Sequence, residues 1–326
     1  MKNNDILSET IKTFIIQGKD YFLNKFPYLS YLYDKSKHTT KNITYYNFWK
    51  TKNFRISEFI KYRKISDKPI DFISVFWPRT VVKYLKNKKI FFTWEDIGKN
   101  SIHWLLDYDD YLLDDVDLSI WFREYNNKNN YIRFPLYIIY LIDPRMEYND
   151  IKNRIDEINN RIINNRDNFC CLIARHDKSW ERELIYKRLK NIWAIDCPSS
   201  FMHNLDIDLP NRDSKRDFLK KYRFNICIEN HSVKWYVTEK LIDSFRSKCI
   251  PIYNWILTDF DKKIINEDAF INTLNKNWVN LVEEIYLNDK KYREFISRKP
   301  FKKDAALIID QHLNLLEWKL RDVLKY

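Results

Sequence analysis

The chain has 326 residues, of which 45% are hydrophobic and 17% aromatic, and its formal net charge is +12. This length fits two globular domains better than one. No stretch of roughly 18 or more apolar residues is present, which excludes a membrane-spanning helix. The first residues also lack the apolar core of a signal peptide, so we expect a cytoplasmic protein.

The five cysteines form no CxxC pair, which predicts buried, reduced thiols. Basic residues gather in three stretches, at 83–89, 212–223 and 290–303. Such a surface suits nucleic acid, anionic lipid or a diphosphate ligand, and it is equally compatible with a solvated basic face. Charge alone does not rank these alternatives. Because no nucleic-acid-binding motif is present, we expect no nucleic-acid partner.

Three apolar runs in the first half predict β-strands, at 70–76, 89–94 and 116–122. They alternate with polar or helical stretches, as in an α/β domain. We therefore assign residues 1–150 to a first domain. Isoleucines recur in the next segment at the spacing of a helix with one apolar face, so residues 151–168 are expected to connect two domains.

The second half alternates strands with helices. In chain order the predicted elements cover 168–174, 179–190, 191–196, 214–222, 224–228, 238–248 and 249–253. This alternation predicts a doubly wound parallel sheet within a second domain, 169–303. The tail, 304–326, has the pattern of one amphipathic helix.

A candidate ligand site follows the buried strand at 224–228, because ligands of open α/β sheets bind at the carboxyl ends of strands. Thr238 is a suitable N-cap for the next helix, and Glu239 and Lys240 fall in its first turn. A lysine is unfavourable at the positive end of a helix unless an anion binds there. Lys240 therefore either contacts a phosphate or points to solvent.

Arg182 occupies the same position after the strand at 168–174. If the two strands are parallel, both helix N-termini open on one edge of the sheet, and Arg182 and Lys240 converge on one anion. Arginine suits bidentate contact with phosphate. Alone, Arg182 would be an ordinary surface residue of a helix, but the pair predicts a diphosphate site.

Two carboxylates, Glu95 and Asp96, come directly after the strand at 89–94 and are candidates for a general base. The alternative is that they cap the next element. Two Asp-x-Asp triplets, at 107–109 and 206–208, match a known metal-binding pattern. Because a basic site for the anion makes a metal less necessary, we expect no metal ligands.

Several segments closely resemble the signature of the α1,3/4-fucosyltransferase family, glycosyltransferase family 10. The matching segments are 222–230 (YRFNICIEN), 236–241 (YVTEKL), 250–253 (IPIY) and the stretch from 169 to 186 that contains Arg182. Residues 92–96 and 131–137 are similar to segments of the bacterial members around their catalytic glutamate. The resemblance covers residues 70–275.

The resemblance implies a GT-B fold, with two Rossmann-like domains facing each other across a crevice. It implies transfer of fucose from GDP-fucose to a hydroxyl of a glycan acceptor, with inversion at the sugar, an α1,3-type linkage, and no cofactor or metal. By match, Glu95 would be the general base, and Arg182 and Lys240 would neutralise the departing GDP. The residues implied to hold the nucleotide and sugar are Asn230, Tyr236 and Glu239.

The chain departs from the family at Trp94, Trp235 and Trp255, which replace glycines or a glycine-containing loop. A bulky Trp94 beside Glu95 would reshape the acceptor pocket. Two alternatives stay open: a transferase of the same fold that uses another GDP-deoxysugar, and an inactive module that binds a sugar nucleotide or glycan. The basic tail, 304–326, would either rest on a membrane near a lipid-linked acceptor or pack on the first domain.

Overall fold

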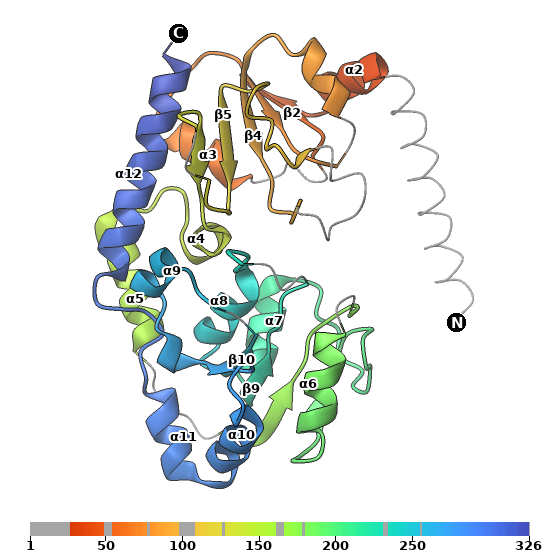
Figure 1. The fold of residues 1–326 in the computed structure, drawn as a ribbon, viewed down its shortest axis with the longest axis vertical. Coiled ribbons are helices and arrows are strands. Elements are labelled where there is room, and N and C mark those ends of the chain that lie inside the picture. Colours follow the sequence, from red (N-terminus) through yellow and green to blue (C-terminus); the bar gives the residue numbers. More distant parts are fainter. Residues whose placement is uncertain are drawn as a thin grey trace, which may run out of the picture. The chain divides into compact units, whose positions relative to one another are not determined.

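The structure is a computed structural model that divides the chain into two compact units (Figure 1). Unit 1 contains Met1–Phe134 and Leu315–Tyr326, and unit 2 contains Pro135–Asn314. The residues that the structure describes are 27–48, 54–76, 79–97, 108–125, 128–160, 166–177, 180–230, 234–254 and 256–325. Both units combine parallel strands with helices, which confirms the predicted α/β class.

The strands described in unit 1 form one sheet in the order β1-β2-β3-β4-β5-β6. Their bounds are Thr39–Thr40 (β1), Ile43–Tyr46 (β2), Ile70–Ile73 (β3), Lys88–Phe92 (β4), Leu118–Trp121 (β5) and Tyr131–Arg133 (β6). β1 pairs with β2 antiparallel, and the other neighbours pair in parallel. The unit also contains α2 (Pro27–Lys37), α3 (Arg55–Tyr62) and the 3₁₀ helix η1 (Arg79–Tyr84).

The three strands predicted for the first half correspond to β3, β4 and β5. Each contributes buried apolar residues to the middle of a parallel sheet, and that pattern is readable in sequence. The sequence did not predict β1, β2 or β6. β1 and β6 have only two and three residues, too few to display a periodicity.

The strands described in unit 2 form a parallel sheet in the order β11-β10-β9-β7-β8. Their bounds are Asn168–Cys171 (β7), Ile195–Asp196 (β8), Tyr222–Ile226 (β9), Ile250–Tyr253 (β10) and Ile271–Asn272 (β11). From β7 the chain moves first to β8 on one side and then to β9 on the other. The sheet therefore has a topological switch point between β7 and β9, where ligands bind in this fold class.

Helices cover both faces of this sheet (Figure 1). The helices described from residue 135 onward are Leu136–Leu141 (α4), Tyr148–Asn159 (α5), Glu181–Leu189 (α6), Arg212–Leu219 (α7), Glu239–Arg246 (α8), Asp259–Ile264 (α9), Glu267–Ala269 (η3), Trp278–Leu287 (α10), Asp289–Ile296 (α11) and Ala305–Leu324 (α12). Cys170 packs in the core with α6, α10 and α11, whereas its neighbour Cys171 packs against α7. All five cysteines are buried and none forms a disulfide, as predicted.

The division at residues 134 and 135 differs from the expected boundary at residue 150, because α4 packs against α8 within unit 2. The buried Tyr137 hydroxyl donates a hydrogen bond to Asp261 Oδ1 at 3.0 Å. Arg246 Nη2 donates to the Leu141 carbonyl oxygen at 3.0 Å. The helix predicted for the tail is α12, whose first half belongs to unit 2 and whose second half belongs to unit 1. Among the helices described, none is both long and apolar enough to cross a membrane.

Helix α8 ends in a left-handed turn that has lysine where glycine is the usual residue. Lys248 has φ 58, its N–H bonds to Phe245 O at 3.0 Å, and Cys249 N bonds to Ser244 O at 3.0 Å. This is the Schellman pattern, whose left-handed position normally takes glycine. Trp235 also has positive φ, at 76, so this replacement in a glycine-containing loop keeps a backbone that suits glycine.

Replacing Lys248 with glycine is expected to raise the free energy of unfolding by about 0.5–1 kcal/mol. Relief of the left-handed conformation contributes about 1–2 kcal/mol, and the greater freedom of glycine in the unfolded chain offsets about 0.5–1 kcal/mol of that. Urea unfolding measures the change. The control is Lys220→Gly at the end of α7, where φ is −59 and glycine should lower stability by about 0.5–1 kcal/mol. A loss of stability in both variants would contradict this account.

Candidate donor-binding site

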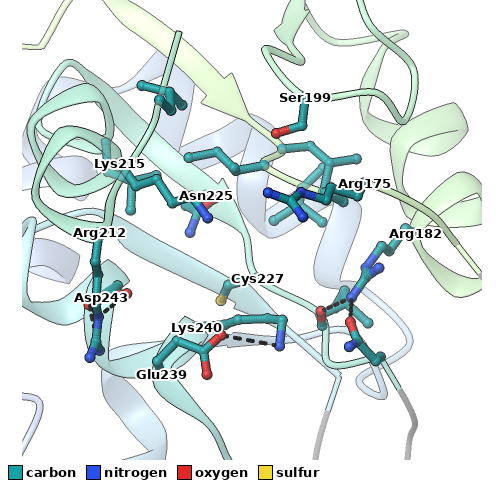
Figure 2. A pocket seen from close by; sticks show the side chains of 18 of the residues that line it. Arg175, Arg182, Ser199, Arg212, Lys215, Asn225, Cys227, Glu239, Lys240 and Asp243 are labelled. Carbon is teal, nitrogen blue, oxygen red and sulfur yellow. Dashed lines mark hydrogen bonds and ion pairs between the residues drawn. The ribbon is translucent and has the colours of Figure 1, made fainter. Parts of the chain in front are cut away.

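A cavity of about 510 Å³ opens in unit 2 at the carboxyl ends of β7 and β9, the switch point of the sheet (Figure 2). The charged side chains that line it are Arg175, Arg182, Arg212, Lys215, Lys240, Glu239 and Asp243. Cations outnumber carboxylates in this set. The cavity therefore has the charge and the position in the fold that an anionic ligand requires.

The buried carboxylate of Glu229 organises the edge of the cavity next to α8. Its Oε1 accepts hydrogen bonds from Thr238 N at 2.8 Å and from the Tyr253 hydroxyl at 3.1 Å. Its Oε2 accepts from Thr238 Oγ1 and from Lys240 Nζ, both at 2.7 Å. One side chain thus ties the end of β9 to the start of α8 and to the end of β10.

Lys240 lies in the first turn of α8, where the sequence predicted an anion-binding cation. Its ammonium also contacts Thr238 Oγ1 at 3.2 Å, and Glu239 Oε1 lies 3.7 Å away. Burial works to lower the pKa of Lys240, but the carboxylates of Glu229 and Glu239 outweigh it and raise the pKa above its ordinary value. Burial likewise works to raise the pKa of Glu239, and Lys240 reverses this and lowers it. Both groups are therefore charged at neutral pH.

Arg182 is almost fully buried, and its guanidinium bridges the segments that follow β7 and β9. Nη1 donates to the carbonyl oxygen of His176, which follows β7. Nη2 donates to Ile228 O at 2.9 Å and to Asn230 Oδ1 at 2.7 Å, both beyond β9. Burial lowers the pKa of Arg182, although the ordinary value is so high that the group stays charged. These contacts fix one positive charge at the switch point.

The structure places four of the six predicted site residues around this cavity: Arg182, Asn230, Glu239 and Lys240. Tyr236 is buried and is not among the residues that line the cavity. Its contact with a nucleotide stays a prediction.

Two predicted helix caps differ in the structure. Thr238 occupies the N-cap position of α8, but its hydroxyl donates to Glu229 instead of capping the helix. Ser179, the expected start of the preceding helix, lies outside the described residues, and α6 begins at Glu181. The carboxylate of Asp177 accepts from Glu183 N at 2.8 Å and so caps this helix from upstream.

Glu95 belongs to unit 1, where it follows β4. Its N–H donates to Thr93 Oγ1 at 3.0 Å, and its carbonyl oxygen accepts from Trp121 Nε1 at 3.1 Å. The other candidate base, Asp96, is buried beside Arg123 Nη2 at 3.3 Å, so Glu95 is the more accessible carboxylate.

Trp94, the side chain next to Glu95, packs in an aromatic cluster. The cluster also contains Phe48, Phe54, Phe76 and Phe92. The large ring is therefore part of the packing of unit 1 behind the loop that carries Glu95. Gly98, two residues beyond Asp96, and Trp255 lie outside the described residues.

Within the described ranges, no group of three or more His, Cys, Asp or Glu side chains could hold a metal ion. Asp107, from the first Asp-x-Asp triplet, lies outside these ranges. In the second triplet, Asp206 Oδ1 lies 2.8 Å from His203 Nε2. The charged groups around the cavity at the carboxyl ends of β7 and β9, called the donor-side cavity below, are instead predominantly cations.

Residues 163–316 match the family model "Glycosyltransferase family 10 (fucosyltransferase) C-term", and this region contains the whole cavity apart from Tyr140. This part of the chain is therefore similar to the C-terminal part of the family 10 fucosyltransferases. The resemblance seen in the sequence is therefore confirmed.

The curated proteins that match the chain include two fucosyltransferases. An alpha-(1,3)-fucosyltransferase from Helicobacter pylori is 26% identical over 255 residues, which are 68% of this chain and 49% of the relative. A GDP-fucose protein O-fucosyltransferase 3 from Xenopus tropicalis is 25% identical over 137 residues, which are 38% of this chain and 28% of the relative. The chain thus spans about half the length, or less, of these relatives.

Solved structures match the chain over most of its length. A crystal structure of an alpha1,3-fucosyltransferase has a TM-score of 0.58 and 18% identity, covering 87% of this chain and 91% of that one. A crystal structure of an alpha1,3-fucosyltransferase with GDP-fucose has a TM-score of 0.55 and 20% identity, covering 89% of this chain and 95% of that one. These matches confirm the GT-B-type fold that the family 10 resemblance implied.

The sequence did not identify Glu229, Arg175 or Lys215 as site residues. Glu229 is the next-to-last residue of the matching segment 222–230, but only the structure shows that its carboxylate accepts four hydrogen bonds. Lys215 lies in the basic stretch at 212–223, for which a diphosphate was one of several partners that the charge pattern left open.

Replacing Glu229 with glutamine is expected to lower the free energy of unfolding by about 2–4 kcal/mol, because Lys240 then loses its nearer carboxylate partner in a buried setting and keeps only Glu239 at 3.7 Å. Urea unfolding measures the loss. The matched control is Glu284→Gln, which removes an exposed ion pair to Lys291 at 2.8 Å and should cost at most about 1 kcal/mol. Equal losses in the two variants would contradict the organising role of Glu229.

Proposed function

We propose that the protein transfers fucose from GDP-fucose to a hydroxyl of a glycan acceptor, with inversion at the sugar and an α1,3-type linkage. The observation that carries this proposal is the basic cavity at the switch point, lined by Arg182, Asn230, Glu239 and Lys240. The similarity to family 10 and the relatives named as α1,3-fucosyltransferases support the donor and the linkage. The acceptor is a glycan, by the same likeness.

The bond changes of this reaction define what the protein must supply. A bond forms between the acceptor oxygen and the anomeric carbon of fucose while the bond from that carbon to the diphosphate oxygen breaks. Negative charge then develops on GDP, and fixed cations placed in advance stabilise it without further reorganisation. Arg182 and Lys240 take this role in the proposal.

Both cations keep N–H groups available to donate hydrogen bonds to the diphosphate. Lys240 directs two of its three N–H groups to Glu229 and Thr238, and Arg182 directs three of its five to His176, Ile228 and Asn230. Their anchored positions favour binding without a large loss of side-chain entropy. Because these cations supply the positive charge, the proposed mechanism requires no metal or other cofactor.

Glu95 is the proposed general base, which takes the proton of the acceptor hydroxyl as the new bond forms. Its position on a loop directly after β4 suits this role, since reactive groups of α/β folds lie at the carboxyl ends of strands. Its neighbour Asp96 is buried with Arg123 and is not proposed as the base.

Glu95→Gln is expected to lower the rate of fucosyl transfer by roughly 10²–10⁴-fold, because general-base catalysis is lost. GDP affinity should stay unchanged, since the base contacts the acceptor rather than the nucleotide. Glu124→Gln, an exposed glutamate of the same unit, is the matched control and should keep full activity. The measurement is GDP release from GDP-fucose in the presence of a panel of glycan acceptors, with and without EDTA.

Each outcome of this assay has a distinct meaning. Full activity of Glu95→Gln would remove Glu95 from the proposed mechanism. Transfer from another GDP-linked sugar, with none from GDP-fucose, would overturn the donor assignment. Loss of activity in EDTA would contradict the metal-independent mechanism. GDP binding without turnover of any GDP-sugar would favour the alternative of an inactive binding module.

A further inference from the structure

The cations of the donor cavity fall into two groups that differ in their partners. Arg212 is matched by a carboxylate: its Nε lies 2.9 and 2.8 Å from the two oxygens of Asp243. Lys240 is matched in the same way by Glu229, at 2.7 Å. The positive charge of these two side chains is therefore largely neutralised inside the protein.

The remaining charged side chains that line the cavity are Arg175, Arg182, Lys215 and Glu239. Three cations accompany one carboxylate, so the cavity keeps two net positive charges. A diphosphate that joins a nucleoside to a sugar carries one negative charge on each phosphate. The unmatched charge of the cavity and the charge of that ligand are therefore equal and opposite.

Arg175 and Lys215 are the members of this set that have no partner. Within the part of the chain that the structure describes, neither side chain donates to a carboxylate or a carbonyl oxygen. In Figure 2, dashed lines reach Arg182, Lys240 and Arg212, and none reaches Arg175 or Lys215. By contrast, Lys220, at the end of the same helix, has a carboxylate partner, Asp217 at 2.8 Å.

The two side chains come from different elements that meet at the cavity. Arg175 follows β7, in a segment held by hydrogen bonds from Phe201 N to Ala174 O at 3.1 Å and from Ser200 Oγ to Arg175 O at 3.1 Å. Lys215 lies in α7, whose N-cap Asn211 accepts from Ser214 N at 2.9 Å. Each cation thus has an anchored backbone and an unengaged charged end.

We propose that Arg175 and Lys215 are diphosphate ligands, which bind the two phosphates of the donor from the β7 side and the α7 side of the cavity. This inference rests on the proposed function, since it names further residues of the same site. The planar guanidinium of Arg175 suits bidentate contact with phosphate oxygens, and the ammonium of Lys215 acts as a point charge. Arg182 and Lys240 then form the anchored side of the site, and Arg175 and Lys215 the side that engages on binding.

The experiment is calorimetric titration of the full chain with GDP and with guanosine. Arg175→Gln and Lys215→Gln should each weaken GDP binding roughly 10- to 100-fold, as expected for the loss of a charge-assisted hydrogen bond. Guanosine, which has no phosphate, should bind each variant as it binds the wild type. The matched control is Lys221→Gln, an exposed lysine close to Lys215 in sequence that does not line the cavity, and it should bind GDP normally.

The outcomes separate this inference from the proposed function. If the wild type binds GDP and both variants bind it equally well, the inference is overturned while the proposed function survives. If the variants lose guanosine and GDP alike, the two residues support the fold of the site rather than the diphosphate, which also overturns it. If the wild type binds no GDP, the proposed function itself fails, and the inference falls with it.

Discussion

The buried carboxylate of Glu229 is the interaction on which the donor-side cavity depends. It accepts four hydrogen bonds and so joins the end of β9, the first turn of α8 and the end of β10. A buried charge is stable only when it is paired and fully hydrogen-bonded, and Glu229 meets both conditions. The same hydrogen bonds that compensate for burying the carboxylate also fix the position of the Lys240 ammonium. Without this carboxylate, Lys240 would lie at the positive end of a helix with only the more distant Glu239, at 3.7 Å, as a carboxylate neighbour.

The order of the strands decides which side chains meet. Because β7 and β9 are neighbours in the sheet although β8 lies between them in sequence, the segments that follow them open on one cavity. Arg182 joins these segments through the carbonyl oxygens of His176 and Ile228. The site is therefore a consequence of the doubly wound topology, and its net positive charge is a property of this edge of the sheet rather than of the basic surface in general.

The sequence predicted those parts of the fold that apolar pattern and alternation encode. The strands β3, β4, β5, β7, β8, β9 and β10 were expected, as were the helices α5, α6, α7, α8 and α12. Helix ends were predicted less well. The helix expected to reach residue 248 ends at Arg246. This end was not predicted because the left-handed position after the helix holds Lys248 instead of the glycine that normally marks a helix end in sequence.

The site was predicted as a set of residues but not as a network. The sequence pattern and the family resemblance pointed to Arg182 and Lys240, and both line the cavity. Neither showed that Glu229 neutralises Lys240, since that contact depends on the path of the backbone between β9 and α8. Arg175 and Lys215 were missed for a related reason. An unpaired cation is identified only when the partners of all its neighbours are known.

The central claim is that the switch-point cavity binds the diphosphate of a nucleotide sugar. Hydrogen–deuterium exchange of the full chain with and without GDP-fucose tests it most directly, because exchange reports on the backbone amides of both units at once. The account predicts slower exchange in the segments that follow β7 and β9 and in the first turn of α8. Unchanged exchange in these segments, together with protection around the separate cavity near Arg79 and Lys83 in unit 1, would contradict it.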